Sequence, residues 1–165
     1  MYSLTGRANT VFFNVLITLS ILSSINYLSV RFNEKKPTDV EFKFHALDTF
    51  TRDSYIKEEA ASFTFDLKAD FGPMMDWNTN IVFAYITCEF KTDKSEKNFV
   101  TIWDRRIGRF ETEEQWIDIK RGLPEYYLTD INKELKNKEV EVYLNWEVMP
   151  TVGLQYRDKV LLGKI

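Results

Sequence analysis

The chain has 165 residues, enough for one domain of about 130 residues and one additional segment. Its 25 acidic and 22 basic residues give a net charge of −3. The clustered basic excess of nucleic-acid-binding proteins is missing, so we expect no nucleic-acid partner. Cys88 is the only cysteine, which excludes an intrachain disulfide.

An uncharged apolar segment runs from Ala8 to Val30. As a helix it would be roughly 34 Å long, enough to cross a hydrocarbon core of about 30 Å. A cleaved signal peptide would have a shorter apolar region and a small-x-small cleavage site, which does not follow here. A buried core helix rarely runs this long without a charge. We therefore predict an uncleaved membrane-spanning signal-anchor over residues 10–30, after a short N-terminal segment, 1–9.

Two features of this segment indicate how it could pack against another helix and which way it crosses the membrane. Ser20 and Ser24 have the small-xxx-small spacing that lets a neighbouring helix approach closely, although a generic span also tolerates such a pair. Arg7 flanks one end, whereas the basic residues within 31–36 flank the other. By the positive-inside rule, this charge bias favours a cytoplasmic C-terminal domain.

A short charged tether, residues 31–39, follows the predicted helix. Its part Asn33–Asp39, about seven residues long, reaches only about 25 Å when fully extended. The globular domain that we predict over residues 40–165 must therefore lie close to the membrane.

Alternation of apolar and polar residues in this domain predicts β-strands with one wet face. It is clearest over residues 62–71 and 139–148. The segment Ile81–Phe90 is apolar on both parities and predicts a central strand covered on both faces. The charged turn Lys91–Lys97 joins it to a further strand, Phe99–Trp103. Shorter candidate strands are Glu41–Ala46, Tyr126–Ile131 and Lys159–Leu162. Several short strands with polar turns indicate an all-β fold, an antiparallel β-sandwich.

One segment is compatible with either a helix or a strand. Thr112 and Gln115 have the spacing of a capping box, and Gly122 could end a helix that starts there. Residues 116–120 also alternate, however, with Ile117 and Ile119 on one face. The pattern alone slightly favours a helix.

The residues of common hydrolytic sites are scarce. A serine or cysteine nucleophile usually needs a histidine base beside it. His45, the only histidine, is expected to be an ordinary surface or hydrogen-bonded strand residue. Ser54, Ser62 and Ser95 stand in no recognisable nucleophile motif. We therefore expect no catalytic residue in this chain.

Metal and cofactor sites are not indicated either. Asp66 and Asp70 project from one side of a predicted strand with Lys68 between them, which is typical of a solvated face rather than a calcium site. Cys88 has no second thiol and lies in the most apolar strand, so we expect a core residue. The 6 glycines form no phosphate-binding loop. We expect neither a metal nor a cofactor.

An ordered set of motifs runs through the predicted domain. It consists of Asp76-Trp77-Asn78, Tyr85, Glu89-Phe90, Ile102-Trp103-Asp104, and Leu144-Asn145-Trp146-Glu147-Val148-Met149-Pro150 with Gly153. Behind a short N-terminus and one membrane helix, this set resembles the signal peptidase complex subunit 3 family, accessory subunits of an endoplasmic reticulum complex. Members often carry a glycosylation sequon near the strand at 139–143, and this chain has none.

The resemblance implies a type II protein of the endoplasmic reticulum membrane, with a cytosolic amino end and a lumenal β-domain. This orientation is opposite to the one that the flanking charges favour. It also implies that Gln115–Lys120 is a strand, and we adopt that prediction over the capping-box one. Cleavage of signal peptides would belong to a separate catalytic subunit with its own serine. The implied partners are that subunit, other small membrane subunits and, indirectly, secretory precursors.

The tryptophans of these motifs are the candidate interface residues. Trp77, Trp103 and Trp146 each adjoin an acidic or amide residue, among them Asp76 and Asp104. One interpretation is that they are core or core-edge residues whose indole N–H finds a local acceptor. The other is that some of them are anchors on a surface that faces the catalytic subunit. Pro150 and Gly153 are expected to end a strand and turn the chain.

We therefore hypothesise that the β-domain docks on the lumenal catalytic subunit and holds its active site near the membrane. One alternative is a single-span lumenal β-sandwich that binds other proteins, of the translocon-associated or cargo-receptor type. Another is a secreted ligand-binding sandwich with a cleaved leader.

Overall fold

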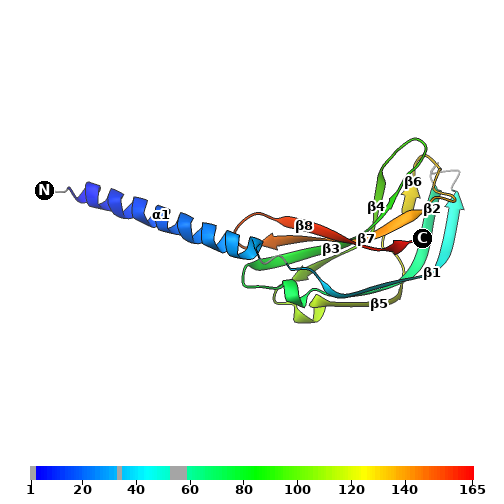
Figure 1. Cartoon of the computed structure of the whole chain (residues 1–165), viewed down its shortest axis with the longest axis horizontal. Helices are drawn as coiled ribbons and strands as arrows, with labels where there is room; N and C mark the ends of the chain where they lie inside the picture. The colour runs from blue at the N-terminus through cyan, green and yellow to red at the C-terminus, as the bar shows by residue number, and fades with distance from the viewer. Residues whose placement is uncertain (1–2, 33–34, 53–58) are drawn as a thin grey trace.

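The computed structural model describes residues 3–32, 35–52 and 59–165. A long helix extends from one end of a β-domain (Figure 1). The strands in the described residues are β1 (Thr38–Arg52), β2 (Glu59–Asp70), β3 (Thr79–Phe90), β4 (Asn98–Gly108), β5 (Trp116–Gly122), β6 (Leu128–Asp130), β7 (Val140–Pro150) and β8 (Tyr156–Lys164). Two single 3-10 turns, η1 (Gly72–Met74) and η2 (Thr112–Gln115), precede β3 and β5.

The helix α1 covers Leu4–Arg31 and projects away from the domain over most of its length (Figure 1). Its stretch Leu4–Ser29 has a mean hydropathy of 1.7, and by length and composition it can cross a membrane. Hydroxyl side chains in it donate to carbonyl oxygens one turn earlier, as Thr18 does to Asn14 at 2.8 Å. Because such bonds satisfy polar groups within the helix, they make the hydroxyls tolerable in lipid.

The domain is a sandwich of two antiparallel sheets. One has the order β1–β2–β5, with β6 also paired to β2, and the other has the order β4–β3–β7–β8. Their apolar faces enclose a core whose largest fully buried side chains include Phe63, Phe65, Phe71, Leu67, Ile86, Leu144 and Trp146. Alternate residues of each strand point to this core because successive side chains lie on opposite faces of a sheet. The predicted fold class, an antiparallel β-sandwich behind one apolar helix, is confirmed.

The strand β3 is central in its sheet, as its apolar sequence predicts, because it pairs with β4 on one side and β7 on the other. Its two faces are not covered equally, however. Val82, Ala84 and Ile86 are fully buried, whereas Phe83 and Tyr85 on the other face are only half-buried. A two-layer sandwich covers one face of each sheet, so the expectation of full cover on both faces was wrong.

Several strands are longer than the sequence predicts. β1 extends well beyond Glu41–Ala46 in both directions, and β4 continues past Trp103. The additional part of β4 includes Arg105 and Arg106, which interrupt the apolar alternation yet pair with Ala84 and Phe83 of β3. Ladder pairing uses backbone groups, so charged side chains at an edge strand do not prevent it.

The ambiguous segment is a strand, and the helix favoured by the pattern alone was wrong. The capping-box residues Thr112 and Gln115 form only the turn η2. From Trp116 the chain is extended, and Ile117 and Ile119 pair with Ala69 and Leu67 of β2. Ile117 is fully buried against the core, and this tertiary burial outweighs the local helix signal.

Candidate interaction site at the helix–sandwich junction

The turn before β3 is held by the side chain of Asp76. Its Oδ1 accepts hydrogen bonds from the backbone N–H of Asn78 at 2.9 Å and of Thr79 at 2.8 Å. The hydroxyl of Thr79 donates to the same oxygen at 3.0 Å. This Asx-type turn fixes the backbone at the start of β3, at the end of the domain nearest the helix.

Asn78 joins this turn to the β7–β8 turn. Its Nδ2 donates to the carbonyl of Val152 at 2.8 Å, and its Oδ1 accepts from the Val152 N–H at 3.0 Å. The carbonyl of Asn78 also accepts from the N–H of Thr151 at 2.6 Å. Pro150 is the last residue of β7 and lies opposite Thr79. Asn78 is 2% exposed, so these bonds are shielded from water and tie two loops into one unit.

The helix contacts this unit directly. The amide of Asn26 donates to Oδ1 of Asn78 at 3.4 Å. The ring of Tyr27 packs against Gly153, where an added Cβ would lie 2.8 Å from Tyr27 Cδ2. Gly153 has φ of +114°, a conformation that L side chains rarely adopt, so both backbone and space require glycine here. A small pocket of about 160 Å³ beside Tyr27 is lined by Pro150 and Leu154 among others.

Trp77, the first candidate tryptophan, is at the surface of this junction. Its side chain is 60% exposed, and its carbonyl accepts a hydrogen bond from Nη1 of Arg109 at 2.7 Å. The Arg109 guanidinium lies 5.6 Å from the ring centroid of Phe110, which is 88% exposed. The β4–η2 loop thus joins the same end of the domain.

The other two candidate tryptophans are core residues. Trp103 of β4 is 4% exposed and Trp146 of β7 is 1% exposed. Asp104 accepts a hydrogen bond from the Tyr126 hydroxyl, which raises the pKa of that phenol. The expectation of a local indole acceptor was wrong for Trp146, because its Nε1 has no partner among the described residues. The structure therefore does not bring the three tryptophans together.

Ser20 and Ser24 lie on the exposed surface of α1. Their hydroxyls donate to the carbonyls of Leu16 and Ser20, both at 2.8 Å. Because each serine hydroxyl already donates a hydrogen bond within its own helix, neither needs a partner from outside, and the small-xxx-small face stays accessible to another helix. Packing there stays a prediction.

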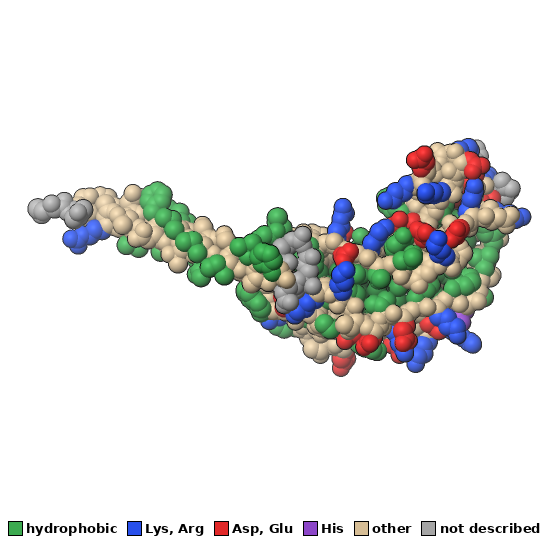
Figure 2. All heavy atoms as spheres, in the orientation of Figure 1, with side chains coloured by type: hydrophobic (Ala, Val, Ile, Leu, Met, Phe, Trp, Pro, Cys, Tyr) green, Lys and Arg blue, Asp and Glu red, His purple; other side chains and the backbone are tan. Residues whose placement is uncertain are grey.

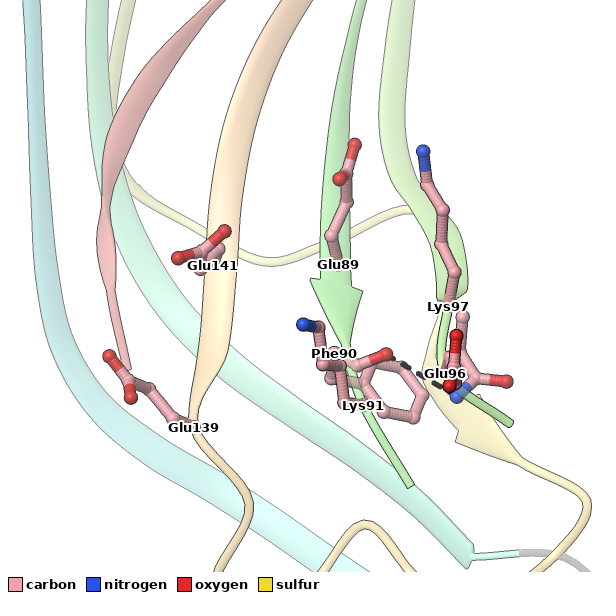
Figure 3. Close-up of a pocket in the computed structure, with 8 residues that line it drawn as sticks. Glu89, Phe90, Lys91, Glu96, Lys97, Glu139 and Glu141 are labelled. Atoms are coloured by element: carbon pink, nitrogen blue, oxygen red, sulfur yellow. Dashed lines mark hydrogen bonds between the residues drawn. The ribbon is translucent and has the colours of Figure 1, made fainter. Parts of the chain in front are cut away.

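The outer face of the second sheet carries a broad open concavity of about 900 Å³ (Figure 3). Glu89 of β3 and Glu141 of β7 are register partners there. Lysines of β8 neutralise this face: Lys159 lies 2.6 Å from Glu89, and Lys164 lies 3.1 Å from Glu141 and 2.8 Å from Glu139. The two carboxylates raise the pKa of Lys164 to about 12.

An apolar groove of about 430 Å³ lies over the inner surface of β1 and β2. It is lined by Phe44, Leu47, Phe50, Phe63, Leu128, Leu135, Val140 and Ile165, among others. Leu47 is 55% exposed, which is unusual for a leucine beside a core. The sequence alone did not reveal this groove, because its lining residues come from β1, β2, β6 and the end of the chain, which are far apart in sequence.

Comparison with known proteins settles the family. The chain matches the family described as signal peptidase subunit over residues 1–163, which includes the helix and all of the sandwich except the last residue of β8. It belongs to the signal peptidase subunit family. This match confirms the family that the motifs resemble. It also confirms the predicted role as a subunit of the signal peptidase complex, because that is the role of the family.

Relatives in the signal peptidase subunit family are distant. Signal peptidase complex subunit 3 of Dictyostelium discoideum is 29% identical over 162 residues, covering 97% of this chain and 91% of that protein. The subunit 3 of Yarrowia lipolytica is 34% identical over 97 residues, 58% of this chain and 51% of that protein. The aligned part thus spans about half of the Yarrowia protein. A solved structure, the Bacillus subtilis sporulation control protein Spo0M, gives a TM-score of 0.30 at 14% identity, covering 74% of this chain and 48% of that one.

His45 is a paired strand residue in this signal peptidase subunit. Its Nε2 lies 2.7 Å from Oδ2 of Asp66, which is half-buried on the neighbouring strand. Asp66 also accepts the Arg121 N–H at 2.7 Å, and these two partners, the N–H first, lower the pKa of its carboxyl. The interpretation of His45 as a hydrogen-bonded strand residue is confirmed.

The remaining chemistry-bearing residues are dispersed. Cys88 is fully buried in β3, as expected for a core residue, and burial raises the pKa of its thiol to about 12. Asp70 accepts the Gly72 N–H at 2.8 Å. Ser54 lies outside the described residues. Within the described residues, no three His, Cys, Asp or Glu side chains lie close enough together to hold a metal ion.

Sequence reasoning missed the contacts that join the helix to the sandwich. Asn26 and Tyr27 are visible as neighbouring polar residues near the end of the uncharged run, which is the one signal that could have suggested them. Asn78 was part of a quoted motif, but its partners Thr151 and Val152 are distant in sequence.

Proposed function

We propose that this chain is a non-catalytic accessory subunit that holds the catalytic subunit of the signal peptidase complex close to the endoplasmic reticulum membrane. The observation that carries the proposal is the family match over residues 1–163. Support comes from the junction, where Asn26 and Tyr27 of α1 contact Asn78 and Gly153 of the sandwich. A domain bound to its own membrane helix at two points offers a fixed support beside the bilayer.

A non-catalytic role agrees with the distribution of reactive groups in the described residues. The only histidine is committed to Asp66, and the only thiol is buried with a pKa raised to about 12. Cleavage of a peptide bond needs an activated nucleophile beside a base. We assign that chemistry to the separate catalytic subunit, and docking and positioning to this one.

Reconstitution of the complex in vesicles with and without this chain tests the proposal. We expect the rate of precursor cleavage to fall several-fold when only this chain is left out. Replacing the serine nucleophile of the catalytic subunit should abolish cleavage while this chain is present. Equal cleavage rates with and without this chain would contradict the proposal.

The proposed lumenal placement of the sandwich has a single-substitution test. D93N would create an Asn-Lys-Ser sequon with Lys94 and Ser95 in the β3–β4 turn, where the side chain of Asp93 is 84% exposed. Glycosylation occurs in the lumen, so D93N should gain a glycan in sealed microsomes. D93Q removes the same charge without creating a sequon and is the matched control. An unmodified D93N whose sandwich is digested by external protease would instead place the domain in the cytosol.

A further inference from the structure

Three loops meet at the end of the sandwich from which α1 extends (Figure 1). They connect η1 to β3, β4 to η2, and β7 to β8. The most exposed large apolar side chain of each is Trp77 at 60%, Phe110 at 88% and Leu154 at 72%. Figure 2 shows hydrophobic side chains along the helix and again where it meets the domain.

Hydrogen bonds hold these loops together. Arg109 donates through Nη1 to the carbonyl of Trp77 at 2.7 Å, and through its backbone N–H to the carbonyl of Asn80 at 3.2 Å. Asn78 bonds the third loop at Val152 through two side-chain contacts. The exposed apolar side chains therefore lie on a fixed surface, which we call the foot: Trp77, Phe110 and Leu154.

The height of the foot along α1 follows from its contacts. Asn78 bonds to Asn26, and Gly153 packs on Tyr27. Both helix residues lie within the uncharged run that ends at Val30. At a rise of 1.5 Å per residue, Asn26 lies about 7 Å before the end of the helix at Arg31. A helix that crosses a bilayer over this run would place its Asn26 turn near the headgroups, together with the two loops that contact it. The β4–η2 loop is held beside them by the bond from Arg109 to Trp77.

We propose that the foot inserts its three side chains into the headgroup region of the leaflet from which α1 emerges. Tryptophan is enriched at this depth because its ring is apolar and its N–H is polar. Burial of Phe110 and Leu154 there removes apolar surface from water. Helix and foot together give the sandwich two attachments to the bilayer and so fix its tilt. The inference rests on α1 crossing the membrane and is independent of the signal peptidase role.

The charges at this end favour insertion by apolar contact. Arg109 and the basic residues within 31–36 lie there, but Glu111, Glu113 and Glu114 follow Arg109 in the chain, and Asp158 lies 3.1 Å from Nζ of Lys36. These carboxylates offset the basic residues, so an anionic surface would gain little attraction. Zwitterionic lipid should therefore be enough.

Spin labels on introduced cysteines test the foot. The full chain in phosphatidylcholine vesicles would carry one label at W77C, F110C or L154C. Cys88, buried and with a raised pKa, stays unlabelled. F99C is the matched control, because Phe99 is also an exposed phenylalanine, at 67%, but lies at the other end of β4 from Gly108. We expect the three foot labels to show the oxygen and metal-chelate accessibility of the headgroup region, and F99C that of water.

Foot labels that are as accessible to the aqueous chelate as F99C would overturn the proposal. Insertion that appears only when anionic lipid is added would also overturn it, because the attraction would then be electrostatic. The vesicles hold no other subunit, so neither outcome bears on the proposed role in the signal peptidase complex.

Discussion

The two ends of the sandwich differ in how their surface groups are used. At the helix end, Asp76 and Asn78 satisfy the backbone of two loops, and exposed side chains are large and apolar. Away from it, the sheet face around Glu89 and Glu141 is charged and paired with lysines of β8. The first arrangement suits a membrane boundary and the second suits water. The Asp-Trp-Asn and Pro-x-x-Gly motifs supply the two residues that contact the helix, Asn78 and Gly153.

The largest expected effect is the difference in unfolding free energy between alanine variants of a buried and an exposed tryptophan, Trp146 and Trp77. W146A removes a side chain that is 1% exposed between the sheets, and we expect it to lower the free energy of unfolding by about 3–5 kcal/mol. W77A removes a side chain at the foot that is 60% exposed, and we expect a change within about 0.5 kcal/mol. Urea unfolding of the full chain in detergent measures both. Equal losses of unfolding free energy would contradict this prediction, because the exposed Trp77 would then stabilise the fold as much as the buried Trp146.

A smaller effect is expected at the turn that contacts the helix. G153A places a Cβ at φ of +114°, 2.8 Å from the ring of Tyr27, and should cost roughly 1–3 kcal/mol. G163A is the control, because its Cβ would meet only Phe42 at 3.9 Å. Adding Y27A to G153A removes the clash but not the backbone strain, so stability should recover only in part. Full recovery would show that φ is not the limiting factor.

The smallest effect concerns a charge pair on the sandwich surface, away from the junction contacts. Because the Arg121 N–H and His45 lower the pKa of Asp66, its carboxylate stabilises the fold above its ordinary pKa of 3.8 and ceases to do so as pH falls through the lowered value. D66N should therefore be slightly less stable than the native chain near neutral pH, with the difference vanishing in acid. H45A should retain part of the effect through Arg121. Denaturation midpoints over a pH series measure it, and a difference that grows in acid would contradict this sign.

The sequence predicted most of the fold because alternation over long strands is a strong local signal. The pattern of apolar residues alone predicts strands over residues 62–71 and Ile81–Phe90; the first lies in β2 except for Phe71, and the second lies in β3. It failed at Thr112–Gln115, where a capping box predicts a helix but pairing of Ile117 with β2 decides otherwise. Local spacing does not include the partner strand, which is distant in sequence.

The candidate site was predicted only in part. Asp76, Trp77 and Pro150 were singled out and do lie at one end of the domain, but Trp103, Trp146 and Asp104 belong to the interior or to another face. The helix residues Asn26 and Tyr27 were missed. Their contacts are with turns more than fifty residues away, and such contacts produce no periodic pattern in the sequence.

The most direct test uncouples the helix from the sandwich while keeping both in the complex. The double variant Y27A/N78A removes the ring contact with Gly153 and the bonds to Asn26 and Val152. N80A, an exposed asparagine in the same region, is the control for substitution alone. In reconstituted vesicles, the account predicts that Y27A/N78A assembles with the other subunits yet cleaves precursors several-fold more slowly than the native complex. Native cleavage rates with the uncoupled variant would contradict it.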